Sequence, residues 1–218
     1  MRLLRLVFEQ IRSGGDRNFG YLLGDREAGS GVLIDPSYSP DVFVERARAQ
    51  GLTMTHVINT HSHPDHTNGN ERALELTGAR LAAHPRMRPT IPLDDGTTLT
   101  VGELQLTTFH VPGHCDDHIV LYESVHKLLL TGDLLFVGKV GGTQSDEDAR
   151  TEWRSLQRLL TLVPDEATVW PGHDYGARPS STIALEKRTN PFLLAGEEAE
   201  FLRTKADWPT LKQRLGLK

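Results

Sequence analysis

The stretch HSHPDH at residues 61–66 places three imidazole groups and one carboxylate within six consecutive positions. A short β-rich run over 56–60 leads into this stretch, and a helical pattern over 71–76 follows it. We therefore expect residues 61–66 to form a loop between a strand and a helix. Few structural needs bring so many metal-binding side chains together, so the stretch indicates a functional site.

The spacing inside the stretch favours two neighbouring metal sites over one. His61 and His63 are two residues apart, so in extended backbone their side chains share a face and point toward the same cation. Pro64 bends the chain, which turns Asp65 and His66 toward an adjacent position.

Further candidate ligands lie in the second half of the chain, each directly after a glycine at the end of a predicted strand. They are His114, Asp133 and His173. Glycine allows the backbone to approach a crowded centre closely. The carboxylate of Asp133 has two oxygens and is therefore able to bridge two cations.

The rest of the sequence alternates short apolar strands, turns and helices. Strands are predicted over 3–8, 20–23, 31–34, 56–60, 80–83, 98–101, 104–110, 119–122, 127–130 and 169–170. Helices are predicted from Ser39 to Gly51, over 71–76, and after Ser145. Each half gives a sheet edged by helices, so we expect an α/β fold with two mixed sheets face to face and helices outside, an αββα sandwich.

We expect residues 1–218 to form one domain, because no repeat or Ser/Gly-rich linker divides the chain. Residues 192–218 are expected to form a short helical tail. Its apolar residues would dock over the edge of the sandwich or pack against a second subunit, so a homodimer is one of two open alternatives.

Composition excludes several classes of protein. Lys plus Arg at 24 against Asp plus Glu at 29 gives a net charge of −5, without a basic block, so we expect no nucleic-acid partner. No run of about 18 apolar residues is present, so no membrane span is expected. The N-terminus reads as a strand rather than a signal peptide. The single Cys115 cannot form an internal disulfide, which agrees with the cytoplasm as the expected location.

The order of these motifs resembles the metallo-β-lactamase-fold superfamily over nearly the whole chain. Within it, five segments resemble the branch of hydroxyacylglutathione hydrolases (glyoxalase II) and persulfide dioxygenases: 21–25, 33–36, 132–138, 171–175 and 186–191. The resemblance implies one metal ion on His61, His63 and His114, and a second on Asp65, His66 and His173. It further implies that Asp133 bridges the two ions.

The first functional hypothesis is a metal-dependent hydrolase that cleaves a small-molecule thioester, like glyoxalase II. Between two divalent ions a shared water ionises near neutral pH and attacks the carbonyl. Asp133 and Asp65 would be the catalytic residues, with Asp65 orienting the hydroxide. Zinc is the first expectation for the ions, with iron or manganese as alternatives.

The expected substrate-binding residues are Tyr175 and Lys139. Tyr175 matches a residue that contacts the thiol substrate in the hydrolases. Gly142 stands where that branch carries a Lys or Arg, and Lys139 is the nearby residue that could substitute for it.

The second hypothesis is a persulfide dioxygenase with a single Fe²⁺. In that case the iron would be held by His61, His114 and Asp133, a set of two histidines and one carboxylate that leaves positions open for O₂ and a thiol-derived substrate.

The remaining histidines and the cysteine receive less specific expectations. One of His110 and His118, which flank His114, is expected to hydrogen-bond a metal ligand. Cys115 lies next to His114, so an additional weak metal donor is one alternative, but it is expected to be a small buried side chain.

Overall fold

A computed structural model describes residues 5–214 and contains two six-stranded sheets. The first sheet has the strand order β1-β2-β3-β4-β5-β6. Strands β1 to β3 pair antiparallel, and β3 to β6 pair parallel. The bounds of these strands are β1 (Leu6–Gly14), β2 (Asn18–Asp25), β3 (Ser30–Ile34), β4 (Thr53–Ile58), β5 (Arg80–Ala83) and β6 (Ile91–Pro92).

The second sheet has the strand order β14-β13-β10-β9-β8-β7, in which β10 and β13 run parallel and the other pairs are antiparallel. Its strands are β7 (Thr98–Val101), β8 (Leu104–His110), β9 (Ile119–Glu123), β10 (Leu128–Gly132), β13 (Thr168–Pro171) and β14 (Ser181–Thr182). A small separate hairpin follows β10 and consists of β11 (Leu135–Phe136) and β12 (Lys139–Val140).

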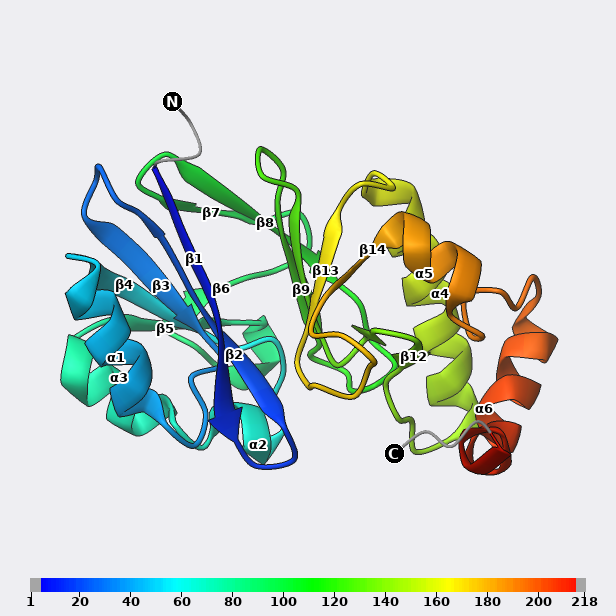
Figure 1. The fold of residues 1–218 in the computed structure, drawn as a ribbon. Helices are drawn as coiled ribbons and strands as arrows, with labels where there is room; N and C mark the ends of the chain where they lie inside the picture. Colours follow the sequence, from blue (N-terminus) through cyan, green and yellow to red (C-terminus); the bar gives the residue numbers. More distant parts are fainter. Residues whose placement is uncertain (1–4, 215–218) are drawn as a thin grey trace.

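Helices cover the outer faces of both sheets (Figure 1). On the first sheet lie α1 (Pro40–Ala49) and α3 (Asn70–Thr77), and on the second lie α4 (Asp146–Leu162) and α5 (Ile183–Thr189), with α6 (Glu198–Arg214) outermost. Two short elements complete the fold, α2 (Pro64–Thr67) and the 3-10 helix η2 (Pro85–Met87). The expected αββα sandwich is therefore confirmed.

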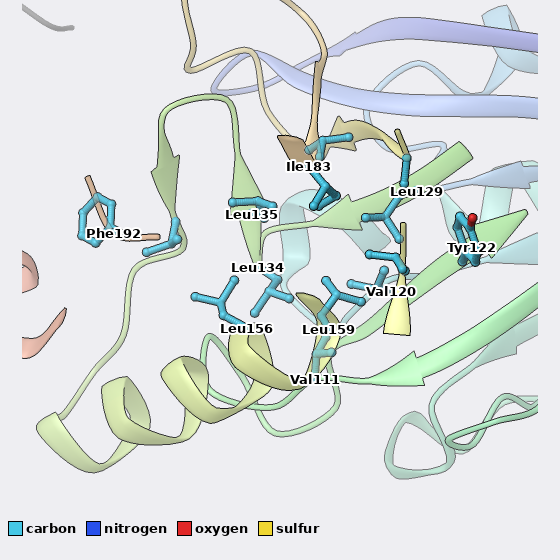
Figure 2. Close-up of a cluster of buried hydrophobic side chains, with 14 of the residues drawn as sticks. Val111, Val120, Tyr122, Leu129, Leu134, Leu135, Leu156, Leu159, Ile183 and Phe192 are labelled. Carbon is cyan, nitrogen blue, oxygen red and sulfur yellow. The ribbon is translucent and has the colours of Figure 1, made fainter. Parts of the chain in front are cut away.

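Three hydrophobic clusters hold these layers together. The cluster between the sheets joins Ile34 and Ile58 of the first sheet to Leu106 and Leu121 of the second. A second cluster packs α1 and α3 onto the first sheet. The third packs α4 onto the second sheet through Leu156 and its neighbours (Figure 2). Each fully buried aliphatic side chain contributes about 1.5–3 kcal/mol, so the strand ends are held on a rigid frame.

Backbone hydrogen bonds tie the strand ends of the two sheets together at one edge. The N–H of Ile119 donates to the carbonyl of Thr60 at 2.8 Å, which joins the start of β9 to the end of β4. The N–H of Phe19 donates to the carbonyl of Gly172 at 2.8 Å, which joins β2 to the end of β13. The loops that leave these strands therefore meet in one place.

Some elements differ from the expectations. Leu3 and Leu4 of the expected first strand lie outside the described residues, and the strand continues to Gly14, because its polar residues pair with β2. The tail forms one helix, α6, with Pro209 inside it, as far as the described residues go. Within residues 5–214, no helix is both long and apolar enough to cross a bilayer.

Candidate metal centre

All of the side chains expected to bind metal come together where the strand ends meet. His61 and His63 follow β4, Asp65 and His66 lie in α2, and His114 lies in the loop between β8 and β9. Asp133 follows β10, and His173 follows β13. Residues that are up to 112 positions apart in the chain, 173 − 61, thus form a single cluster.

The first group of ligand atoms surrounds His63. Its Nδ1 atom lies 3.0 Å from His61 Nε2 and 3.0 Å from His114 Nε2. The ligand atoms of His61, His114 and Asp133 also lie within 4.8 Å of one another. Both arrangements expected from the sequence, three histidines or two histidines and a carboxylate, are therefore geometrically available.

The second group consists of Asp65, His66 and His173. The Nε2 atoms of His66 and His173 are 3.3 Å apart, and Asp65 Oδ2 lies 3.4 Å from His173 Nε2. Asn18 Nδ2 donates to Asp65 Oδ2 at 3.0 Å and fixes the carboxylate.

Asp133 lies between the two groups. Its Oδ1 atom is 3.4 Å from His66 Nε2, and its Oδ2 atom is 3.6 Å from His114 Nε2 and 3.3 Å from His173 Nε2. Within the described part of the chain, Oδ1 is buried and accepts no hydrogen bond. A buried, unpaired carboxylate oxygen facing several imidazole nitrogens is typical of a cation site.

Hydrogen bonds on the far side of the rings orient the histidines. The Nδ1 atoms of His66, His114 and His173 lie 3.0, 2.7 and 2.8 Å from Asp35 Oδ2, Gly142 O and Asp16 O, respectively. These acceptors require a proton on Nδ1, so each Nε2 atom presents a lone pair to the centre when the ring is neutral. The residues therefore fit divalent metal ions that accept imidazole and carboxylate ligands.

Asp35 is a functional residue that the sequence interpretation missed. Besides His66, it accepts hydrogen bonds from Thr60 N at 2.9 Å and Thr60 Oγ1 at 2.6 Å. The Thr60 hydroxyl in turn lies 3.0 Å from His61 Nδ1. One buried carboxylate thus orients a histidine in each group. The signals in the sequence were its position directly after the apolar strand β3 and its place within segment 33–36, which carries the family resemblance but was given no role there.

His118 and Cys115 also lie at the cluster, where the Cys115 sulfur is within 4.8 Å of ligand atoms of His61 and His63. His118 is the one flanking histidine that hydrogen-bonds a candidate ligand: its Nε2 accepts from Asp133 N at 2.9 Å, whereas His110 Nε2 donates to Asp116 O. Cys115 is half-buried, and its thiol donates to Asp117 Oδ1 at 3.1 Å. Burial, together with this carboxylate, raises the pKa of the thiol, so Cys115 is held as a neutral donor.

Glycine is required at two of the positions that precede the candidate ligands. A Cβ atom at Gly172 would overlap Asp133 Oδ1 and lie 2.9 Å from His66 Cε1. Gly113 has a φ of +138°, and a Cβ atom there would overlap the backbone of Glu152 in α4. The expected close approach of backbone to the centre is therefore observed.

Burial and charge act in opposite directions on the ligands. Burial by itself lowers the pKa of His66, but the carboxylates of Asp133 and Asp35 together raise it well above its ordinary value. Burial would raise the pKa of Asp133, but His66 and the other histidines hold it well below the usual range. Burial lowers the pKa of His61 well below its ordinary value. In the metal-free protein, these interactions favour the imidazolium form of His66 and the ionised form of Asp133.

This charge state predicts that metal uptake releases protons. A cation can bind His66 Nε2 only after the proton has left the ring, so metal affinity should fall as the pH is lowered. We expect about one to two protons per chain at pH 7, measured by calorimetric titration in buffers with different ionisation enthalpies. The same apparent enthalpy in every buffer would contradict this charge state.

A cavity of about 610 Å³ lies beside the second group. Tyr175 lines it and stacks on His173, with the ring centroids 4.7 Å apart. The Tyr175 hydroxyl donates to Asp16 Oδ2 at 2.6 Å. Lys139 Nζ lies 4.3 Å from the centroid of the Tyr175 ring, and the Arg17 guanidinium lies 4.8 Å from it. The two expected substrate-binding residues thus line one cavity next to the candidate ligands.

Comparison with known proteins agrees with this geometry. Residues 14–86 and 85–173 match the family model described as the metallo-beta-lactamase superfamily. The chain belongs to this superfamily. Its members carry the fold observed here, and the recognition made from the sequence motifs is confirmed.

Similar members of the superfamily carry two different names. A hydroxyacylglutathione hydrolase of Polaromonas sp. is 34% identical over 178 residues, which cover 78% of this chain and 67% of that protein. The human mitochondrial persulfide dioxygenase ETHE1 is 30% identical over 206 residues, which cover 92% of this chain and 79% of that protein. The crystal structure of ETHE1 from Myxococcus xanthus matches this chain with a TM-score of 0.85 and 32% sequence identity. The match covers 93% of this chain and 91% of the ETHE1 chain.

Membership in the superfamily makes the chain an enzyme with a metal centre. The two named activities occur among relatives of similar identity. Sequence likeness therefore leaves the specific reaction to be argued from the site.

Proposed function

We propose that the chain is a metal-dependent thioester hydrolase that uses two divalent metal ions. The observation that carries this proposal is the place of Asp133, whose two oxygens face the first and the second group of ligands. A hydrolase with two metal ions uses both groups. A single-iron enzyme needs only His61, His114 and Asp133. The set of Asp65, His66 and His173 would then bind no metal ion.

The bound ions supply Lewis acidity and lower the pKa of water toward neutrality. The chain's own residues supply position and proton transfer. Asp65 Oδ2 is fixed by Asn18, and its side chain is 35% exposed, so it is accessible to solvent and substrate. There it accepts a hydrogen bond from the attacking water and orients it toward the substrate carbonyl. His118 holds the Asp133 backbone, and Asp35 holds the His66 ring. These contacts fix the positions of the two groups relative to each other.

The cavity beside His173 supports a thiol substrate that carries negative charge. Its lining includes four basic side chains: Arg17, Lys139, Arg178 and Lys212. Within residues 5–214, no acidic group forms an ion pair with the last three of them. Glu186 also lines the cavity, but its Oε2 accepts hydrogen bonds from Gly138 N and Asn190 Nδ2, both at 2.9 Å. These bonds hold the turn that carries Lys139.

Replacing Lys139 by Met should raise KM about tenfold and leave kcat within about twofold, because the lost contact is to the carrier and not to the reacting atoms. The measurement is steady-state hydrolysis of an anionic thioester, with a neutral thioester as a second substrate. Lys187→Met is the matched control, since Lys187 pairs with Asp165 at 2.6 Å and does not line the cavity. An equal rise of KM for the neutral thioester would contradict the role of charge.

A persulfide dioxygenase is the second candidate. The structural match to ETHE1 from Myxococcus xanthus favours it, because the match extends over 91% of the ETHE1 chain. The three ligands it requires, His61, His114 and Asp133, have their ligand atoms within 4.8 Å of one another.

One paired assay separates the candidates. The protein is loaded with Zn²⁺ or with Fe²⁺, and each form is tested for thioester cleavage and for O₂ uptake with a glutathione persulfide. We expect cleavage by the zinc form and no persulfide-dependent O₂ uptake by either form. Rapid O₂ uptake by the iron form, without thioester cleavage by either, would replace the hydrolase by the dioxygenase.

The cellular location, the partners and the oligomeric state expected from the sequence stay predictions. They are a cytoplasmic location, no nucleic-acid or membrane partner, and the alternative of a homodimer. Light scattering on the full chain measures the oligomeric state.

A further inference from the structure

A buried ion pair lies behind His114 and takes no part in the proposed reaction. Glu152 of α4 has a fully buried side chain, and Lys205 of α6 is 12% exposed. The Lys205 ammonium pairs with Glu152 Oε2 and also donates to the carbonyl of Gly141 at 2.9 Å. Burial raises the pKa of Glu152 and lowers that of Lys205. Neither charge is favourable at this place without the other.

The pair contacts the segment that orients a candidate metal ligand. Gly142 follows Gly141 directly, and its carbonyl accepts the Nδ1 proton of His114 at 2.7 Å. A Cβ atom at Gly141 would lie 3.0 Å from both Glu152 Oε1 and His114 Nδ1. The carboxylate, the glycine segment and the imidazole are therefore packed in direct succession.

A buried side chain of helix α6 anchors the helix where Lys205 can reach Glu152 and Gly141. Phe201, one turn before Lys205 on the same face, is fully buried in the cluster beneath α4. The backbone of Glu152 in turn lies against Gly113, next to His114. Figure 1 shows α6 beside α4 on the outside of the second sheet.

We propose that Lys205 is a positioning residue of the metal centre: it fixes the Gly141–Gly142 segment, and through the Gly142 carbonyl it holds the His114 ring with Nε2 toward the other ligands. The inference rests on the proposed metal-dependent function. It makes α6, at the far end of the sequence, a condition for full metal affinity.

The first test is Zn²⁺ affinity of the full chain, measured by competition with a chromophoric chelator. Lys205→Met should weaken binding of the first ion about 10- to 100-fold, the usual effect of removing an interaction that orients a metal-binding histidine. Lys205→Arg keeps a cation and N–H donors and should recover most of the affinity. Arg203→Met, an exposed loss of the same charge in the same helix, is the matched control and should bind as the wild type does.

A double variant separates positioning from folding. Glu152→Leu/Lys205→Met replaces the whole pair by apolar groups, so the melting temperature of the metal-free protein should return close to that of the wild type. Zn²⁺ affinity should stay reduced, because Gly141 still lacks its donor. Recovery of affinity together with stability would overturn the proposal and leave a purely structural ion pair.

A third readout needs neither metal nor substrate. In metal-free protein with ¹⁵N-labelled histidine, the His114 Nδ1 proton should be slow to exchange in the wild type and exchange faster in Lys205→Met. An unchanged His114 signal would overturn this inference alone. Absence of metal binding by the wild type would instead count against the proposed function.

Discussion

Replacing Asp133 by Asn should reduce thioester hydrolysis about 10³-fold or more, since the two oxygens of this side chain face both groups of ligands. The amide has the shape of the carboxylate, but it lacks the negative charge and one of its ends carries N–H donors, so it cannot bridge two cations. We expect the variant to bind fewer metal ions than the wild type. Elemental analysis and steady-state kinetics on the same preparation give both values.

Asp25→Asn is the matched control for Asp133→Asn. Asp25 is also fully buried, and it accepts hydrogen bonds from Arg5 Nε and, at 2.8 Å, from Glu103 N. Its loss should cost about 1–3 kcal/mol of stability and leave metal content unchanged. If Asp133→Asn behaved like Asp25→Asn, with lower stability but a full complement of metal, Asp133 would be a structural residue only.

Replacing Asp35 by Asn should weaken metal binding about 10- to 100-fold and lower the rate, because Asp35 orients His66 directly and His61 through Thr60. Asn suits the backbone at this position, where φ is +47°, since Asn tolerates the left-handed region. The effect therefore reports the lost charge and the lost acceptor rather than backbone strain. The measurement is the dissociation constant for Zn²⁺.

Asp41→Asn serves as the control for the Asp35 variant. Asp41 lies six residues later in the chain, at the start of α1, and pairs on the surface with Arg72 at 2.8 Å. Exposed pairs of this kind contribute little to stability, and Asp41 touches no candidate ligand, so metal affinity should not change. Equal affinities of the Asp35 variant and the wild type would show that the imidazoles are oriented without this carboxylate.

The candidate metal ligands could be selected from the sequence because each lies in a local pattern. The motif at 61–66 is compact, and His114, Asp133 and His173 each follow a glycine at a strand end. Parallel and antiparallel strands that end at the same edge bring such residues together. The spacing could not give the distances, and it could not show which nitrogen of each ring faces the centre.

The residues that orient the ligands had no such pattern. Asp35 directly follows an apolar strand. An acidic residue at such a position is also common in an ordinary turn without a functional role. Glu152 lies within a helix, where glutamate is normally exposed, and its burial depends on Lys205, which is 53 positions later in the chain. Helix α2 and the hairpin β11–β12 are too short for a periodicity to develop. These features follow from tertiary packing.

The most direct test of the account is the number of metal ions bound by the full chain. Protein purified without chelators is saturated with Zn²⁺, desalted and analysed for metal and protein together. We expect two ions per chain in the wild type and fewer in Asp133→Asn. A wild type that binds none, or that binds the same number as the Asp133 variant, would contradict it.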